Sequence, residues 1–116
     1  MLKALKNLIP LDHKVALYVP EKQLDGTLIE NRELYVNKVR TLFSSLFGGC
    51  TSTDAIGSWV LTNGKLQNEL IKVVYSYSTQ LTNELIESVI EFAMILKSEL
   101  NQEAISLEVD NVLYFI

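Results

Sequence analysis

Two segments with helical hydrophobic periodicity constrain this chain most, because apolar runs typical of β-strands flank each of them. The apolar positions of the two segments recur every three or four residues: Tyr35, Val39, Leu42 and Leu46, then Leu85, Val89, Phe92 and Leu96. We therefore predict amphipathic helices over residues 31–47 and 82–100. Asn31 and Thr82 are suitable N-caps, and Gly48-Gly49 favours a left-handed stop after the first helix.

The remaining apolar segments predict five strands, over residues 13–20, 55–61, 70–78, 104–109 and 112–116. Asn63-Gly64 favours a type I′ hairpin turn, and Asp110-Asn111 favours a second tight hairpin. The predicted order is β-α-β-β-α-β with an added C-terminal strand. Two helices on one face of an antiparallel sheet make this an α+β fold, the ferredoxin-like split β-α-β sandwich.

Length and composition favour one globular domain over residues 1–116, since 48% of the residues are hydrophobic. Residues 1–11 are expected to be either a partly ordered terminus or a short arm that docks on a partner. We recognise no signal peptide and no apolar run long enough for a membrane span, so a cytoplasmic protein without a membrane partner is expected. A mean hydropathy of +0.19 favours apolar surface covered by another subunit.

Several short motifs carry a family resemblance that extends over residues 15–116. They are ALYVP in the first strand, FGGCTS after the first helix, Gly57-Ser58-Trp59 with Gly64-Lys65-Leu66 and Glu69, and the closing LNQEAISLEVDNVLYFI. In these motifs the chain resembles small uncharacterised α+β proteins of bacteria and their mobile elements. The resemblance implies a compact ferredoxin-like fold and a phage or mobile-element setting, and it implies no activity.

The charges are distributed unevenly along the chain. The formal net charge is −4, so a partner of duplex nucleic acid is not expected. Residues 76–116 hold seven acidic residues and one basic residue. A candidate partner-binding surface lies on the second helix: Glu84, Glu87, Glu91, Met94 and Ile95. This surface is either a solvated helix face or the contact of an acidic inhibitor with a basic partner such as a host defence nuclease.

The segment after the first helix is the candidate ligand-binding site, and it comprises Gly48, Gly49, Cys50, Thr51, Ser52 and Thr53. Successive backbone N–H groups and three hydroxyls can surround a small anionic or nucleotide-like ligand. The segment ends a helix and has no lysine beside its hydroxyls, unlike a P-loop. The alternative interpretation is a helix stop followed by a polar loop.

Three tyrosines lie on the strands that we expect at the centre of the sheet, namely Tyr18, Tyr75 and Tyr77. Such aromatic residues stack on unpaired bases in RNA-recognition domains. The basic and glycine residues of those domains are missing here, so we favour association of the sheet faces of two subunits. On the predicted register Tyr18 can also face away from the other two tyrosines. Trp59 is expected to pack in the core.

Candidate catalytic residues are few. Cys50 follows a helix C-terminus, where the helix dipole disfavours a thiolate, so a structural thiol is expected. His13 is expected at the surface of a strand edge, without partners at metal-ligand spacing. We therefore expect no catalytic residue, metal or cofactor. The predicted function is that of a non-enzymatic, self-associating protein that binds a small anionic ligand or a basic protein.

Overall fold

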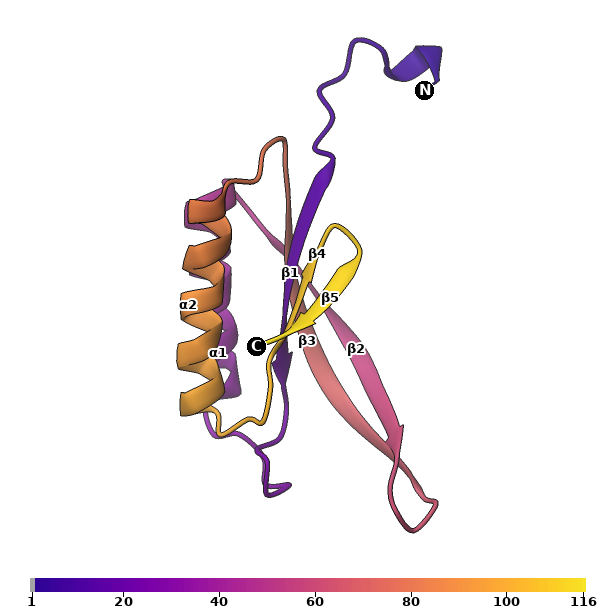
Figure 1. The fold of residues 1–116 in the computed structure, drawn as a ribbon, viewed down its shortest axis with the longest axis vertical. Coiled ribbons are helices and arrows are strands. Elements are labelled where there is room, and N and C mark those ends of the chain that lie inside the picture. Colours follow the sequence, from indigo (N-terminus) through magenta and orange to yellow (C-terminus); the bar gives the residue numbers. More distant parts are fainter. Residues whose placement is uncertain (1) are drawn as a thin grey trace.

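Two helices cover one face of a five-stranded antiparallel sheet in the computed structural model, which describes residues 2–116 (Figure 1). The elements in chain order are η1 (Lys3–Leu5), β1 (His13–Pro20), α1 (Arg32–Phe47), β2 (Thr51–Val60), β3 (Leu66–Ser78), α2 (Asn83–Glu99), β4 (Ser106–Val109) and β5 (Val112–Phe115). The predicted α+β, ferredoxin-like order with an added strand is confirmed. No helix within residues 2–116 combines the length and the apolar character that crossing a membrane requires.

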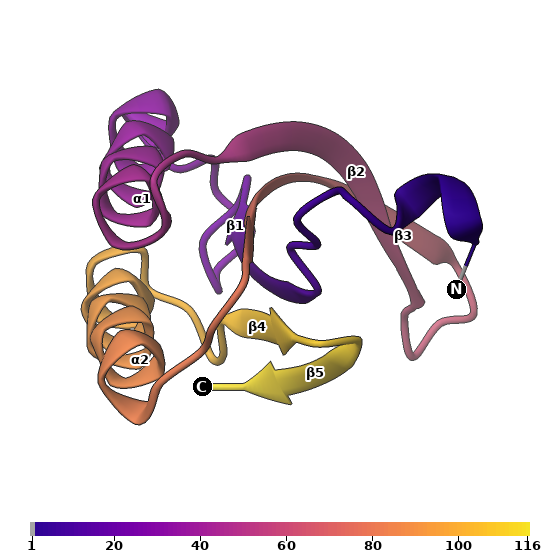
Figure 2. The same cartoon turned by 90° about the horizontal axis from the view of Figure 1, so that it is seen from above.

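Strand β1 lies at the centre of the sheet, whose order is β2-β3-β1-β4-β5. It pairs with β3 from His13 opposite Ser78, and with β4 from Val15 opposite Val109. Seen from above, the sheet bends away from the helices at both edges (Figure 2). The face without helices, which we call the open face, is therefore concave.

The hydrophobic core lies between β1 and the two helices. Alternate residues of β1, namely Val15, Leu17 and Val19, face the helices and have no exposed surface. The helices contribute buried side chains to the same cluster: Val36, Val39, Phe43, Val89, Ala93 and Leu96. This alternation follows from strand geometry, in which successive side chains point to opposite faces of the sheet.

Strands β2 and β3 are longer than the sequence predicted. Strand β2 begins at Thr51 instead of residue 55, and β3 begins at Leu66 instead of residue 70. The added residues are largely polar and show no apolar alternation. They become strand because each strand supplies the other's backbone partners, from Thr51 opposite Tyr75 to Val60 opposite Leu66.

The two hairpin turns differ in their backbone geometry. Asp110 and Asn111 have φ of 50° and 69°, as a type I′ turn requires, so a tight hairpin is confirmed there. At the β2–β3 turn only Gly64 has a positive φ, 83°, and its N–H donates to the Leu61 carbonyl at 2.9 Å. The predicted type I′ turn is wrong at this position, since Asn63 does not adopt the left-handed conformation.

The helix ends lie at the three predicted residues, and two of these residues cap in the expected way. The Thr82 hydroxyl accepts a hydrogen bond from the Leu85 N–H at 3.2 Å, and Gly48 ends α1 with φ of 86°. Asn31 occupies the predicted N-cap position, but it has φ of 55° and its side chain makes no capping hydrogen bond. Its backbone carbonyl instead accepts from the Leu34 N–H at 2.9 Å.

A ribbon formed by the outer parts of β2 and β3 projects beyond the helical layer (Figure 1). Trp59 on this ribbon is 45% exposed, so its expected place in the core is wrong. No part of residues 2–116 covers the ribbon there, because both helices end before it (Figure 1). Four aliphatic side chains on its other face are also exposed: Ile56, Val60, Leu66 and Leu70.

Candidate functional site

The open face carries a group of aromatic and charged side chains from β1, β3 and β4. Cross-strand pairs share a face, and the register pairs Tyr18 with Val73, Ala16 with Tyr75, and Lys14 with Tyr77. The three predicted tyrosines therefore lie on one face, and the expectation that Tyr18 can face away from the others is wrong. The residue register, set by long-range pairing, decides this orientation.

One row of paired residues crosses all five strands on the open face. It reads Thr51, Tyr75, Ala16, Glu108 and Leu113 from β2 to β5. Ala16 is the smallest side chain of the row and lies at its centre. It has no exposed surface, although no helix covers this face, because larger side chains surround it. At the centre of the open face, Ala16 therefore forms a flat floor between the ring of Tyr75 and the carboxylate of Glu108.

Five side chains around this floor contact one another, and we call them the open-face cluster: Lys14, Tyr18, Tyr75, Tyr77 and Glu108. The Tyr18 hydroxyl donates to Glu108 Oε1 at 3.0 Å, and Lys14 Nζ lies 3.6 Å from Glu108 Oε2. The same Nζ atom is 4.9 Å from the centroid of the Tyr75 ring. The rings of Tyr75 and Tyr77 meet edge to face at 5.8 Å between centroids.

The Tyr18 hydroxyl stays protonated in this environment. Burial raises its pKa above the usual value of 10.0, and the hydrogen bond to Glu108 and the negative charge of that carboxylate raise it further. Tyr18 is therefore a fixed hydrogen-bond donor that orients Glu108. The cluster offers one positioned carboxylate and two aromatic rings to a ligand on the open face.

Two hollows flank the open-face cluster. The hollow of about 160 Å³ lies between the strand ends and the α2–β4 connection. Its lining includes Tyr18, Glu69, Gln102 and Ser106. A second hollow of about 280 Å³ lies at the other end of β3. Its lining includes Tyr75 and Tyr77, together with Gly48, Gly49, Cys50 and Thr51 of the predicted ligand segment.

The Glu69 carboxylate at the smaller hollow is held by backbone groups. Its Oε1 atom accepts hydrogen bonds from the N–H groups of Glu21 and Lys22, at 3.1 and 2.9 Å. Glu21 in turn accepts from the Leu70 N–H at 3.1 Å. No signal near Glu69 in the sequence marks it as a site residue, since its partners lie almost fifty positions away.

The predicted ligand segment is partly strand. Thr51, Ser52 and Thr53 belong to β2 and pair with residues 73–75 of β3. Successive N–H groups of a strand point in opposite directions, so these residues form no cradle of converging N–H groups. The Ser52 hydroxyl accepts from Arg40 Nε at 2.9 Å, and so it faces α1. Only Thr51 of the three hydroxyl residues lines the hollow beside the tyrosines.

Cys50 and His13 make local contacts. The Cys50 thiol lies 3.6 Å from both the Ser44 hydroxyl and the Arg40 carbonyl, at the end of α1. His13 Nδ1 lies 2.8 Å from Asp110 Oδ2, and Asp110 Oδ1 accepts from the Lys14 N–H at 2.9 Å. The hydrogen bond to Asp110 raises the pKa of His13, and the same bond lowers the pKa of Asp110. Asp110 thus fastens the β4–β5 hairpin to β1.

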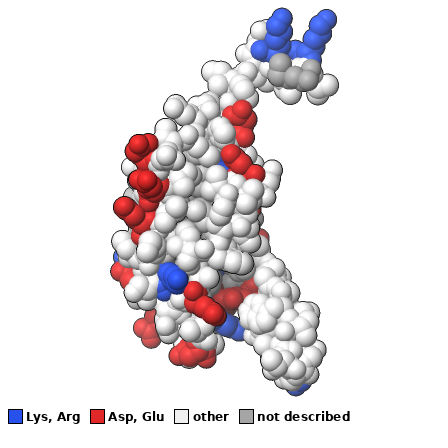
Figure 3. Space-filling view, viewed as in Figure 1, with Lys and Arg blue, Asp and Glu red and all other residues white. Residues whose placement is uncertain are grey.

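The predicted partner-binding residues lie on the outer surface of the helical layer. Acidic side chains gather over α2 in the space-filling view, while lysines occupy the tip of the N-terminal segment (Figure 3). Glu84, Glu87 and Glu91 are exposed, as are Met94 and Ile95. Their role in binding a partner stays a prediction. This surface lies on the opposite side of the molecule from the open face.

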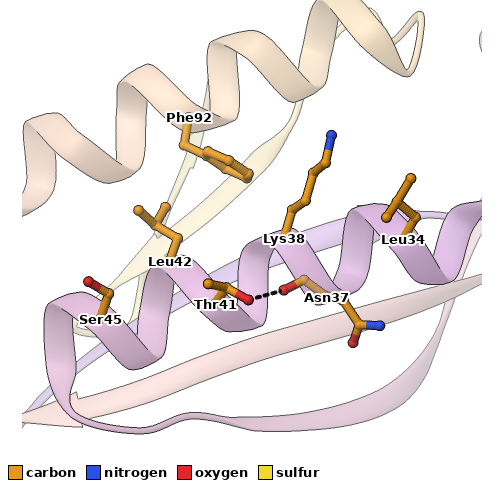
Figure 4. A pocket seen from close by; sticks show the side chains of 7 residues that line it. All are labelled: Leu34, Asn37, Lys38, Thr41, Leu42, Ser45 and Phe92. Atoms are coloured by element: carbon orange, nitrogen blue, oxygen red, sulfur yellow. Dashed lines mark hydrogen bonds between the residues drawn. The ribbon is translucent and has the colours of Figure 1, made fainter.

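A further groove of about 530 Å³ lies between α1 and α2 (Figure 4). Phe92 points from α2 toward α1, whose Leu34, Lys38 and Leu42 line the other side. The Thr41 hydroxyl turns back to its own helix, where it donates to the Asn37 carbonyl at 2.9 Å. The groove gathers no set of polar groups on a common point. Across residues 2–116, no three His, Cys, Asp or Glu side chains are grouped so as to hold a metal ion.

Comparisons with known proteins place this geometry in context. No protein-family model and no curated protein matches the chain. Among solved structures, a phage SAM lyase in complex with S-methyl-5′-thioadenosine superposes with a TM-score of 0.64 at 13% sequence identity. The match covers 100% of this chain and 95% of the lyase chain. A phage SAM lyase in the apo state gives a TM-score of 0.56 at 14% identity, over 90% and 87% of the two chains.

These likenesses establish the shared fold and correct one expectation from the sequence. The chain was expected not to be an enzyme, because no acid–base pair, nucleophile or metal set is recognisable along the sequence. Both of the solved structures reported above are those of a lyase, so that expectation is contradicted. Their phage origin agrees with the mobile-element setting that the sequence resemblance implies. The chain therefore shares its fold with these two structures.

Proposed function

We propose that this chain binds a sulfur-containing adenosine derivative on its open face and cleaves SAM as a lyase. The observation that carries this proposal is the fold likeness over the whole chain to a SAM lyase in complex with S-methyl-5′-thioadenosine, written MTA below. The proposal retains the nucleotide-like ligand expected from the sequence and moves it toward the tyrosines of the sheet. The ligand expected from the sequence was anionic, whereas the proposed substrate SAM carries a positively charged sulfonium group.

The open-face cluster has the chemistry to bind SAM, which carries a positive charge on its sulfonium sulfur. A carboxylate and an aromatic face both attract such a cation. Glu108 and Tyr75 supply these two groups on either side of Ala16. The exposed ring of Tyr77 beside the larger hollow gives an adenine base a surface on which to stack.

The positive charge disappears during the proposed cleavage. The bond between the sulfur and the amino-acid carbon chain breaks, and its electron pair returns to sulfur, which becomes the neutral thioether of MTA. A carboxylate oxygen of the same substrate forms a new bond to the carbon that leaves sulfur. This step closes a ring within the released fragment and transfers no proton. Glu108 stabilises the bound cation more than a transition state in which that charge is dispersing. Its role is therefore binding and orientation of the substrate.

A second copy of the chain completes the proposed site. Each hollow on the open face is smaller than the roughly 300–1,000 Å³ typical of pockets for small ligands. The open face is concave (Figure 2), and its tyrosines Tyr18, Tyr75 and Tyr77 can contact a second copy of the chain. Native mass spectrometry tests this step: we expect an oligomer that retains MTA, and a monomer with or without MTA contradicts it.

The activity is tested with the purified chain and SAM. We expect MTA to accumulate in a chromatographic assay and to bind the protein in calorimetry. A chain that neither forms MTA nor binds MTA or SAM contradicts the proposed function. Glu87→Gln is the matched control for changes of charge, because Glu87 is exposed on α2, away from the open face.

Glu108→Gln separates binding from catalysis. The variant keeps the size of the side chain and removes the negative charge that attracts the sulfonium. We expect KM for SAM to rise by about tenfold, with kcat changed less, because the interaction is strongest before the charge disappears. The affinity for MTA should not fall, because MTA is neutral and has no charge for Glu108 to attract. An equal loss of kcat and kcat/KM would show instead that Glu108 acts in the transition state.

A further inference from the structure

The open face already holds a cation of its own. Lys14 Nζ lies between the Glu108 carboxylate, at 3.6 Å, and the Tyr75 ring, at 4.9 Å from its centroid. The Glu108 side chain is only 17% exposed, whereas that of Lys14 is 32% exposed. The carboxylate is therefore the sheltered partner, and the ammonium group is the one that can reach solvent.

The walls of this cation site are held by groups other than Lys14. Glu108 Oε1 is fixed by the Tyr18 hydroxyl at 3.0 Å, which leaves Oε2 for the cation. The Tyr75 ring meets the Tyr77 ring edge to face. Ala16 separates Tyr75 from Glu108 in the same row and gives the site a small, flat floor. The site thus keeps its shape when Lys14 moves away.

The Lys14 side chain can readily leave its position between Glu108 and Tyr75. Its ammonium group is compact and strongly hydrated, and it sits on a flexible stem of four carbons. A sulfonium or quaternary ammonium group is larger and more weakly hydrated, and it is attracted to the same carboxylate and ring. Both cations cannot occupy the space beside Glu108 Oε2 at once. A bound ligand cation must therefore expel the ammonium group.

We propose that Lys14 is a tethered competitor in a cation site formed by Glu108, Tyr75 and Tyr18, from which a sulfonium or quaternary ammonium ligand displaces it. If SAM is the ligand, which rests on the proposed function, Lys14 discriminates between the charged substrate and the neutral product. The substrate cation displaces the ammonium group. Once cleavage makes the sulfur neutral, the ammonium group returns to Glu108 and drives the product out.

The test is a titration of wild type and Lys14→Met with tetramethylammonium, followed through the tyrosine signals in NMR. Methionine keeps an unbranched, flexible side chain without the charge. We expect tetramethylammonium to bind about tenfold more tightly to Lys14→Met. Lys14→Arg keeps a tethered cation and should bind it as weakly as wild type. Unchanged or weaker binding by Lys14→Met overturns the proposal.

Lys72→Met is the matched control. Lys72 also pairs with a carboxylate, Asp54 Oδ1 at 2.5 Å, and its side chain is 20% exposed, but it lies on the other face of the sheet. This variant should leave tetramethylammonium binding unchanged. An equal gain in Lys72→Met would mean that net charge alone controls binding, which also overturns the proposal.

A parallel titration with SAM and MTA separates this inference from the proposed function. Lys14→Met should bind both more tightly, and it should release MTA more slowly than wild type. Tighter tetramethylammonium binding without any cleavage of SAM supports the cation site and contradicts the lyase assignment. Cleavage of SAM with no effect of Lys14→Met on either ligand contradicts the tethered competitor alone.

Discussion

The two faces of the sheet are built from the same strands and have opposite chemistry. Toward the helices, Val15, Leu17 and Val19 of β1 have no exposed surface and pack in the core. Between them, Lys14 and Tyr18 face away from the helices and make charged or hydrogen-bonded contacts with Glu108. The comparison shows that one strand supplies stability through one set of residues and a candidate site through the other. Substitutions on the two faces should therefore have separable effects.

Leu17→Ala should give the largest loss of stability. Leu17 is fully buried in the hydrophobic core, so its truncation leaves a cavity that costs about 2–5 kcal/mol. Denaturant unfolding should show a lower midpoint with an unchanged m-value. Tetramethylammonium binding by the folded fraction should remain as in wild type. A loss of binding in protein that is still folded would show that the two faces are coupled.

Tyr18→Phe should have a smaller effect on stability and a clear effect on binding. The substitution removes the hydrogen bond to Glu108 and keeps the ring, which costs about 1 kcal/mol. Glu108 then loses its orientation, and affinity for tetramethylammonium should fall several-fold in calorimetry. Ser88→Ala, which removes an exposed hydroxyl bound to the Glu84 carbonyl on α2, should leave that affinity unchanged. An unchanged affinity in Tyr18→Phe would mean that Glu108 needs no support.

The pH dependence of the His13–Asp110 contact should be the smallest effect. The pKa of His13 is raised above 6.5 in the folded state, so the stability that it contributes is complete below pH 6.5. That contribution is lost as the pH rises through the raised value. The lowered pKa of Asp110 means that its contribution is present above pH 3.8 and is lost at more acidic pH.

Thermal unfolding of wild type and His13→Asn checks this effect. Wild type should lose a small increment of Tm between pH 5.5 and pH 8, and the variant should lose less. The Asp110 bond to the Lys14 N–H does not depend on His13, so the β4–β5 hairpin should stay in place. Parallel curves for the two proteins across this range would contradict a role for His13 in fastening it.

Local signals in the sequence predicted most of the fold. The helix periodicities, the Thr82 cap and the Asp110-Asn111 turn depend on residues that are close in sequence, and the structure confirms them. The length of β2 and the side of the sheet on which Tyr18 lies depend on pairing with distant strands. Nothing near these residues in the sequence carries that information, which is why both expectations failed.

The candidate site was predicted in part for the same reason. The three tyrosines stood out as aromatic residues on strands, although their role in association is still to be tested. Lys14 and Glu108 were not singled out, because only the pairing of β1 with β4 brings them together. Without that pairing, nothing in the sequence places Glu108 beside Lys14 or a tyrosine ring. The expectation of a chain without enzyme activity depended on this missing contact.

The central place of β1 has a consequence for how the chain is made. Its partners in the sheet lie far downstream, since Val15 pairs with Val109. At a synthesis rate of about 5–20 residues per second, roughly 5–20 s pass between the appearance of these two residues. During that time the apolar side of β1 has no complete sheet or helical layer to cover it. Slow, long-range pairing of this kind favours aggregation between nascent chains, so the yield of folded protein should increase when fewer chains are made at once.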